Sequence, residues 1–266
     1  MSPMPPTDAR PGAGAFGIIA RNERLRPAFV AGADYVEPIV VGTLVVPDGE
    51  RWVRNPDYAG PERAPSFAIL VPADLRLSDP RTEITDLESY AEQVFAIIGS
   101  VAVPGALVVL GSGGARTIPD GITPTAGRDR FADSVRVLRD AAERHGVRII
   151  LEPLNSRESN LICSLREAVD FLDEYGIDRV DVVADLQHMM VEGESLDEIV
   201  ALGSRIGHAH ICDTERTPPG RGDWPLGEFL TALRRGGYDG PVTIEANFTD
   251  FESELADALV WLRAHA

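Results

Sequence analysis

Four short, largely apolar runs in this chain each lead into a side chain that can ligate a metal ion. Residues 148–151, 181–184, 207–209 and 242–244 form the runs, and the residues that follow them are Glu152, Asp185, His210 and Glu245. The intervals between these four residues are 33, 25 and 35 positions, about the length of one strand and one helix. We therefore predict that four successive parallel strands end at a common height, which in a parallel barrel is the C-terminal rim where active sites are built.

Eight strand-like runs alternate with helical patterns along the chain. The runs are short and rich in Val and Ile, as expected of strands that are buried on both faces. Between them, apolar residues recur at helical spacing, as at Phe131, Val135, Leu138 and Ala142. The alternation predicts an α/β fold, a single-domain (β/α)8 TIM barrel. The predicted strands span residues 16–20, 35–41, 67–71, 106–110, 147–151, 180–184, 206–211 and 241–246.

The predicted domain organisation has three parts. Residues 1–14 read as a flexible N-terminal tail, without the basic start and apolar centre of a signal peptide, and residues 15–266 form the barrel. Within the barrel, residues 43–66 hold four prolines and no helical stripe, which predicts an irregular insertion with a hairpin around residues 47–49. This insertion is a surface excursion, an exposed seam for a partner subunit, or a lid that carries Trp52 over the site.

Composition and charge exclude several classes of function. A net charge of −17 disfavours a nucleic-acid partner, which requires clustered cations. The chain contains no lysine, so it can form no Schiff base and attach no pyridoxal phosphate. The glycine-rich residues 111–116 lack the spacing of an NAD-binding fingerprint, although their N–H groups could cradle an oxyanion. No apolar stretch is long enough to span a membrane, and two cysteines form no disulfide framework, which predicts a cytoplasmic protein.

Three carboxylates and one imidazole form an oxygen-rich ligand set with a formal charge of −3. Such a set suits one divalent cation, Mn2+, Mg2+ or Co2+, better than a zinc site rich in nitrogen or sulfur. Acidic residues also end strands for ordinary reasons, such as capping the next helix. Four ligands at one repeating interval favour the metal site.

Further polar residues lie near the ends of the predicted strands and in the loops beyond them. His208 and His210 are two positions apart on one strand and share a face; His210 is closer to the rim, which makes it the ligand and His208 a supporting or core residue. His188 can bind a substrate oxygen or ligate the metal itself. Arg216 and Arg221 can balance nearby carboxylates or hold a hydroxyl, carboxylate or phosphate of a substrate.

On these motifs the chain resembles the sugar isomerase/epimerase branch of the xylose isomerase-like TIM barrels, which contains the D-tagatose and D-psicose 3-epimerases. The resemblance covers most of the chain from about residue 15. It is carried by Leu151-Glu-Pro-Leu-Asn155, Ala184-Asp-Leu-Gln-His-Met189, Gly207-His-Ala-His210, Pro219-Gly-Arg-Gly222 and Gly237-Tyr-Asp-Gly-Pro-Val-Thr-Ile-Glu245. It implies that Glu152, Asp185, His210 and Glu245 hold one divalent ion, commonly Mn2+, and that Glu158, His188 and Arg216 contact the substrate.

The resemblance also implies a mechanism. A ketose chelates the metal through its carbonyl and a neighbouring hydroxyl, which acidifies the C–H between them and stabilises an enediolate. Glu152 and Glu245 are the candidate catalytic pair, one removing the proton and the other returning it on the opposite face. The expected partner is a small sugar or sugar derivative, and a homo-oligomer or partner subunit is left open.

Two other enzyme classes and one binding role remain as alternatives. A lyase or dehydratase of the same superfamily would begin with the same proton abstraction and then eliminate from a keto-sugar, a keto-inositol or a 3-keto-glycoside. An endonuclease IV-like phosphodiesterase would need more histidines on earlier strands, and no histidine precedes His145. A barrel that only binds sugar would not need two facing carboxylates.

Overall fold

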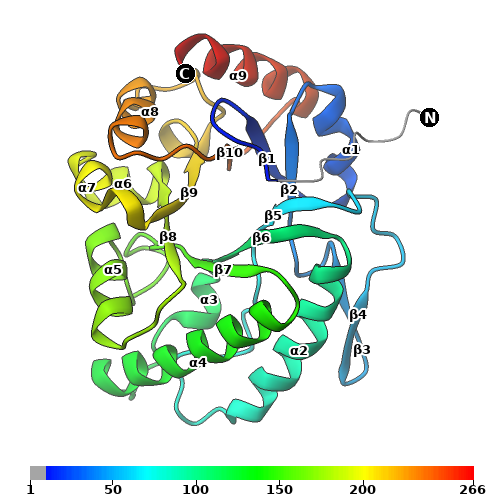
Figure 1. Ribbon diagram of the computed structural model, residues 1–266, viewed down its shortest axis with the longest axis vertical. Coiled ribbons are helices and arrows are strands. Elements are labelled where there is room, and N and C mark those ends of the chain that lie inside the picture. The colour runs from blue at the N-terminus through cyan, green and yellow to red at the C-terminus, as the bar shows by residue number, and fades with distance from the viewer. Residues whose placement is uncertain (1–9) are drawn as a thin grey trace.

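Short runs of Val and Ile form a central sheet of eight parallel strands that curls into a nearly closed barrel, shown in a computed structural model that describes residues 10–266 (Figure 1). The order around the sheet is β2-β1-β10-β9-β8-β7-β6-β5. The strands are β1 (Phe16–Ala20), β2 (Tyr35–Pro38), β5 (Ala64–Phe67), β6 (Ala102–Leu110), β7 (Arg148–Leu151), β8 (Asp181–Asp185), β9 (Ile206–Ile211) and β10 (Val242–Ile244). The predicted TIM barrel is confirmed.

The barrel closes where the chain leaves β2 and β5. Ala68 N donates to Pro38 O at 3.1 Å, and Val40 N donates to Ala68 O at 2.8 Å. Ile39 and Ala68 form an isolated parallel bridge at the same place. The first and last strands of the sheet order are therefore joined by a few bonds just beyond their C-terminal ends.

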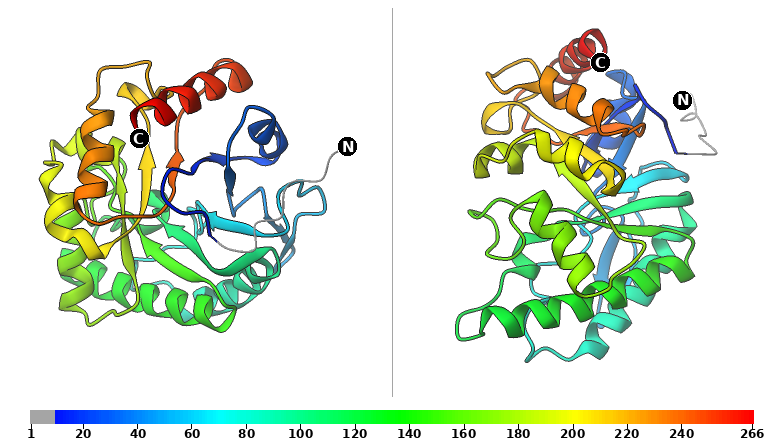
Figure 2. Two further views of the ribbon diagram at one scale, coloured as in Figure 1. Left: turned by 45° about the horizontal axis from the view of Figure 1, so that its top comes forward. Right: turned by 60° about the vertical axis from the view of Figure 1, so that its left-hand side comes forward.

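Helices form the outer layer of the barrel (Figure 2). Their apolar stripes lie against the strands: in α4, Phe131, Val135, Leu138 and Ala142 are all buried. Ser164 caps α5 by accepting a hydrogen bond from Glu167 N. The helices are α1 (Asn22–Val30), α2 (Ile84–Ser100), α3 (Gly113–Arg116), α4 (Pro124–Arg144), α5 (Leu165–Glu174), α6 (Leu186–Glu192), α7 (Asp197–Leu202), α8 (Leu226–Arg235) and α9 (Phe251–His265), with short 3-10 turns at Gly203–Arg205 and Thr214–Arg216.

The barrel interior is divided into an apolar and a polar half. Leu107, Val109, Ile150 and Val183, from β6, β7 and β8, form a small buried cluster separate from the main core between strands and helices. Because side chains alternate along a strand, the face that carries Ile150 and Val183 also carries Glu152 and Asp185. The other half of the interior contains buried polar residues from β2, β5, β9 and β10: Tyr35, Glu37, Ser66, His208, His210 and Thr243.

Several predicted strand boundaries were wrong: β6 begins at Ala102 and not at residue 106, β10 ends at Ile244 and not at residue 246, and the two strands beside the insertion also differ. The strand predicted at 67–71 is β5, which ends at Phe67; Ile69 has a φ of 53°, a left-handed conformation that no strand continues through. The strand predicted at 35–41 ends at Pro38, after which the chain turns into the insertion.

The predicted insertion at 43–66 contains the predicted hairpin and no helix, but it ends earlier than predicted, because residues 64–66 belong to the barrel strand β5. Its strands, β3 (Val45–Asp48) and β4 (Arg51–Arg54), pair antiparallel and lie outside the barrel beside α2 (Figure 1). Trp52 packs edge-on against Tyr90 of α2, with ring centroids 5.2 Å apart, and its backbone N–H donates to Gln93 Oε1. Trp52 thus lies against α2 and does not line the cavity that Glu152 and Glu245 face, so the structure does not support the lid alternative.

None of the helices in residues 10–266 combines the length and apolar character that crossing a bilayer would need. Of the predicted tail, residues 1–9 lie outside the described part of the chain.

Candidate metal centre

The four residues at the predicted interval converge at the C-terminal rim. Glu152 and Glu245 follow β7 and β10, Asp185 ends β8, and His210 lies one position before the end of β9. His210 Nδ1 is 2.8 Å from Glu152 Oε1, 3.5 Å from Glu245 Oε2 and 3.6 Å from Asp185 Oδ2. One ligand atom from each of the four lies within 4.8 Å of the others.

Local structure positions two of these carboxylates. Asp185 is the N-cap of α6: its Oδ1 accepts a hydrogen bond from His188 N at 2.9 Å, which leaves Oδ2 facing His210. Helix capping and a place in the cluster are thus compatible roles for one side chain. Behind Glu152, the buried Arg116 donates to Glu152 O at 2.5 Å and to Ile162 O at 3.0 Å, which holds the backbone that carries the carboxylate.

Burial and neighbouring charges give the two carboxyl groups different proton affinities. Burial raises the pKa of Glu152, although hydrogen bonding to His210 acts in the opposite direction. Burial also raises the pKa of Asp185, but its interactions with the imidazoles of His188 and His210 outweigh burial and hold this pKa well below the usual range. Of these two, Glu152 is the more ready to accept a proton.

The donor set fits a hard divalent cation. Three carboxylates and one imidazole nitrogen provide an oxygen-rich set with no thiolate, as Mn2+, Mg2+ and Co2+ prefer. Three of the four side chains are buried, with exposed fractions of 6% for Glu152, 3% for Asp185 and 1% for His210. Two buried carboxylates beside a half-buried third are costly without positive charge, which a divalent cation would supply.

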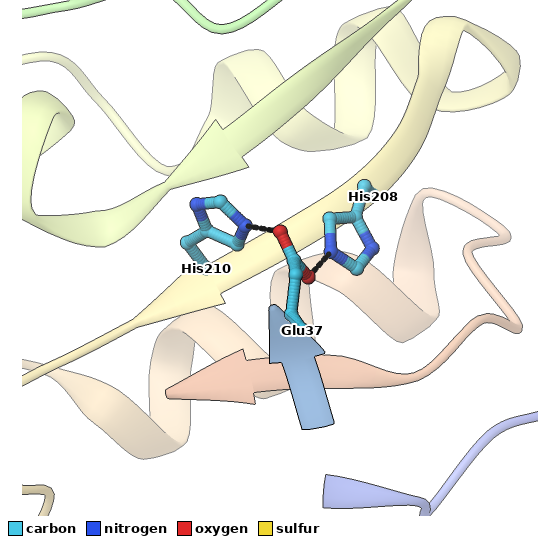
Figure 3. Close-up of side chains that lie close together, drawn as sticks. All are labelled: Glu37, His208 and His210. Carbon is cyan, nitrogen blue, oxygen red and sulfur yellow. Dashed lines mark hydrogen bonds and ion pairs between the residues drawn. The ribbon is translucent and has the colours of Figure 1, made fainter. Parts of the chain in front are cut away.

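A buried carboxylate on β2 supports the imidazole of this set from the other side. Glu37 lies between His208 and His210 in the barrel interior (Figure 3), with Oε2 2.9 Å from His208 Nε2 and Oε1 3.3 Å from His210 Nε2. Burial raises the pKa of Glu37, but the two imidazoles lower it by a larger amount, so this pKa lies well below the usual range. Our sequence analysis missed Glu37. The signal that could have found it is a carboxylate at an inward position of an otherwise apolar strand.

Two of the four clustered residues, Glu152 and Glu245, line a cavity of about 490 Å³, and Glu158, His188 and Arg216 line it with them. Arg216 lies 3.0 Å from Glu245 Oε1 and 3.3 Å from Glu158 Oε1, so it bridges the two glutamates. His188 Nδ1 accepts a hydrogen bond from Asn155 N at 3.0 Å, so the ring proton is on Nε2, which can donate to a substrate oxygen. The structure thus brings three of the four predicted substrate-binding residues to the ligand cluster.

Two arginines singled out in the sequence lie elsewhere. Arg221, the fourth predicted substrate-binding residue, is paired with Glu254 at 2.9 Å and Asp257 at 3.3 Å on α9, so the structure does not bring it into the set. Arg116, in the glycine-rich run read as a possible oxyanion cradle, is fully buried and turned inward. Spacing alone does not show which way an arginine turns, because its long side chain can reach several partners.

Comparison with known proteins adds to this geometry. A family model described as "Xylose isomerase-like TIM barrel" matches residues 89–265. The 3-dehydro-D-guloside 4-epimerase of Escherichia coli is 32% identical over 139 residues, which are 51% of this chain and 53% of that protein. The D-psicose 3-epimerase of Ruminiclostridium cellulolyticum is 38% identical over 118 residues, 44% of this chain and 40% of the relative. The chain therefore matches about half the length of these relatives.

Solved structures extend the likeness of fold to almost the whole chain. The D-psicose 3-epimerase of Clostridium cellulolyticum, solved with D-tagatose, covers 94% of this chain and 99% of its own length, with a TM-score of 0.76 and 23% identity. The 3-keto-D-glucoside 4-epimerase of E. coli covers 94% and 98%, with a TM-score of 0.72 and 24% identity. At this level of identity the likeness shows the fold.

Proposed function

The chain belongs to the xylose isomerase-like TIM barrel family, and we propose that it is a divalent-metal-dependent sugar isomerase or epimerase that acts on a ketose-type substrate by proton transfer. The observation that carries the proposal is the convergence of three carboxylates and one imidazole, with two of the glutamates facing one cavity. Mn2+ is the first candidate for the cation, and Mg2+ and Co2+ also suit the ligands.

The residues of the cavity have separate roles in this proposal. When bound by Glu152, Asp185, His210 and Glu245, the cation would polarise the substrate's carbonyl and neighbouring hydroxyl and acidify the C–H between them. Glu152 takes the proton from one face, and Glu245 exchanges a proton at the opposite face.

The remaining polar residues of the cavity bind the substrate or orient Glu245. His188 Nε2 and Glu158 bind substrate oxygens. Arg216 orients Glu245 through their contact at 3.0 Å and can also contact the substrate, because it lines the same cavity.

The relatives bear on the class of reaction. Those named above are sugar epimerases by name: two comparisons name a 4-epimerase of a 3-keto-glycoside, and two name a 3-epimerase of the ketose D-psicose. This supports epimerisation and gives no support to the lyase alternative. The two substrate types share a carbonyl next to the carbon that is inverted, so a substrate with that arrangement is the class we propose.

The test is solvent proton exchange. Mn2+-loaded protein is incubated with a panel of ketoses and keto-glycosides in D2O, a chelator removes the metal, and proton NMR reads the substrates. We expect metal-dependent deuterium incorporation without loss of mass. Glu152→Gln and Glu245→Gln should each slow exchange by about 100-fold or more, as expected for loss of a general base or acid.

The matched control is Glu252→Gln, which makes the same chemical change on the exposed face of α9 and should exchange like the wild type. Persistent exchange in both active-site variants would rule out their proposed role. Exchange accompanied by loss of water or of an aglycone would reassign the protein as a lyase.

A further inference from the structure

The carboxylate of Glu37 is fully buried and accepts four hydrogen bonds. Its Oε2 accepts from Ser66 Oγ at 2.8 Å, from Thr243 Oγ1 at 2.9 Å and from His208 Nε2 at 2.9 Å, and its Oε1 accepts from His210 Nε2 at 3.3 Å. Figure 3 shows the carboxylate between the two imidazoles. A buried carboxylate persists only when such donors compensate its lost hydration.

These bonds determine which nitrogen of His210 carries the proton. An ionised carboxylate only accepts hydrogen bonds, so the Nε2 that faces Glu37 must be protonated. In a neutral ring the lone pair is then on Nδ1, which faces Glu152, Asp185 and Glu245 at 2.8 to 3.6 Å. We propose that Glu37 is a positioning residue: it holds the tautomer and ring rotation of His210 in which Nδ1 is the metal ligand.

The same three residues, Glu37, His208 and His210, could also be read as a second metal site, because their ligand atoms lie within 4.8 Å of one another. The hydrogen bonds argue against this reading. Oε2 already accepts from three donors, more than the two lone pairs of one oxygen. Oε1 is turned to His210, whose other nitrogen faces the first cluster. The arrangement is that of a supporting hydrogen-bond network.

The test is Mn2+ affinity, measured from free Mn2+ by electron paramagnetic resonance. Glu37→Met, which removes the acceptor, should weaken binding about 10- to 100-fold, the usual effect of losing a supporting carboxylate. Glu37→Gln keeps one acceptor oxygen that can face His210, and it should recover part of the affinity. Ser66→Ala removes another partner of the same carboxylate without touching His210, and it should stay within about threefold of the wild type.

A second readout is independent of the variants. In Mg2+-loaded wild type, long-range 1H–15N NMR of the histidine rings should show His210 protonated on Nε2. Protonation on Nδ1 overturns the proposal, and so does a folded Glu37→Met variant with wild-type Mn2+ affinity. The inference rests on the metal cluster of the proposed function. If the wild type binds no Mn2+, that function fails, while protonation of His210 Nε2 in the metal-free protein still tests the contact between Glu37 and His210.

A separate observation concerns the mouth of the substrate cavity. Arg21 and Arg24, at the start of α1, line a space of about 350 Å³ together with Glu158, Arg216 and Glu245. Arg216 is already paired with both of these glutamates. Within residues 10–266 the side chains of Arg21 and Arg24 form no hydrogen bond or ion pair that would neutralise them, and Arg24 lies over the ring of Phe251 at 4.8 Å.

Arg21 and Arg24 are thus two guanidinium groups without an acidic partner among the described residues, at the edge of this cavity and on a chain whose net charge is −17. They create a local positive potential that attracts an anionic ligand, and a guanidinium can bind a carboxylate or a phosphate with two parallel hydrogen bonds. We infer that the substrate carries an anionic group, a carboxylate or a phosphate, which Arg21 and Arg24 bind while the ketose end reaches the metal cluster. This inference rests on the proposed function.

Calorimetric titration of the Mn2+-loaded protein tests it with three probes: D-fructose 6-phosphate, D-fructuronate and D-fructose. At least one anion should bind about tenfold or more tightly than D-fructose, and the tighter of the two identifies the group. Arg21→Ala combined with Arg24→Ala should abolish this preference. Arg26→Ala, which removes an exposed arginine of the same helix outside the cavity, should keep it.

Equal binding of all three probes, or a preference that survives the double substitution, overturns the inference. Its failure is distinct from failure of the proposed function. If a neutral ketose exchanges its proton and no anion binds more tightly, the proposed function is supported and the anion site is contradicted. If the protein prefers anions in a way that depends on Arg21 and Arg24 but exchanges the proton of no substrate, the anion site is supported and the proposed reaction is contradicted.

Discussion

At the scale of single residues, the candidate metal cluster requires a glycine beside it as well as the four side chains that form it. Gly111, just after β6, lies against Glu152: a Cβ at this position would be 2.1 Å from Glu152 Oε2. That distance is far below van der Waals contact, so any larger residue would displace the carboxylate. The glycine is needed for this close approach and not for a special backbone angle.

We therefore expect Gly111→Ala to weaken Mn2+ binding and slow solvent exchange by about tenfold or more, because about 1.4 kcal/mol of lost ligand geometry is a factor of ten. Calorimetric titration with Mn2+ measures the first effect and NMR exchange the second. Gly227→Ala is the matched control, since a Cβ there meets no atom within 4 Å. Unchanged Mn2+ affinity in a folded Gly111→Ala protein would show that Glu152 can move without consequence.

A second residue-scale prediction concerns Arg116, whose two hydrogen bonds go to backbone carbonyls of different segments. Arg116→Met would leave Glu152 O and Ile162 O buried without that donor, and we expect a loss of about 2 to 4 kcal/mol in the free energy of unfolding. Urea unfolding followed by circular dichroism measures it. Arg157→Met, at an exposed position in the loop after β7, is the control; equal stability of the two variants would contradict a structural role for Arg116.

At the scale of elements, the N-terminus of α5 shows how a loop from the next unit completes a helix. Ser164 Oγ accepts from Glu167 N at 3.1 Å, as an N-cap does. The side chain of Glu194, from the loop between α6 and α7, accepts from Leu165 N at 2.9 Å. Burial raises the pKa of Glu194 from 4.5 to about 7, although the bond from Leu165 acts against it.

The raised pKa predicts a pH dependence with a definite sign. Between about pH 4.5 and 7 the folded protein keeps a proton on Glu194 that the unfolded chain has released, so this group lowers stability progressively as pH rises through that window. Glu194→Gln resembles the protonated form. We expect its melting temperature relative to the wild type to rise from pH 4.5 to 7 and level off above 7, as measured by thermal scans across that range.

Glu88→Gln, at an exposed position of α2, is the control for the change of charge. A difference between Glu194→Gln and the wild type that stays constant with pH would mean that Glu194 titrates alike in the folded and unfolded states. A difference that shrinks as pH rises would mean that its pKa is lowered by folding, the opposite of our expectation.

At the scale of the whole molecule, the metal cluster joins four consecutive parallel strands at one end of the barrel. β7, β8, β9 and β10 are neighbours in the sheet, and each carries one of the four candidate ligands at or next to its C-terminal end. A cation at this place would therefore cross-link about half of the barrel, and it would bind the folded chain in preference to the unfolded one.

We expect Mn2+ at about 100 times its dissociation constant to stabilise the fold by about 2.7 kcal/mol. For a chain of this length that corresponds to a rise of roughly 5 to 10 °C in melting temperature, which EDTA should reverse. Differential scanning calorimetry measures the shift, and Asp185→Asn, which removes a ligand and keeps an acceptor for the cap of α6, should lose most of it. A wild-type protein indifferent to Mn2+, Mg2+ and Co2+ would contradict the site.

The sequence pattern was sufficient to predict those features that depend on residues close together in sequence or on a pattern that repeats along the chain. Buried strands require apolar runs and amphipathic helices require a stripe, so the barrel could be predicted from periodicity. Because parallel strands of one sheet end at one edge, the interval between strand ends predicted that Glu152, Asp185, His210 and Glu245 converge. The hairpin at 45–54 followed from its turn residues.

Tertiary structure decided the contacts between segments that no local pattern relates. Glu37 meets His210 across 173 positions of sequence, and the curl of the sheet brings their side chains together inside the barrel, although β1 and β10 lie between β2 and β9. The direction of long arginine side chains was decided in the same way: Arg116 turned into the core, Arg221 turned to α9, and Arg216 turned to the cluster. The sequence alone thus determined the fold and which four ligands converge, because these depend on period and strand order. The groups that surround those ligands depend on which distant strands and loops become neighbours, and the folded barrel decides that.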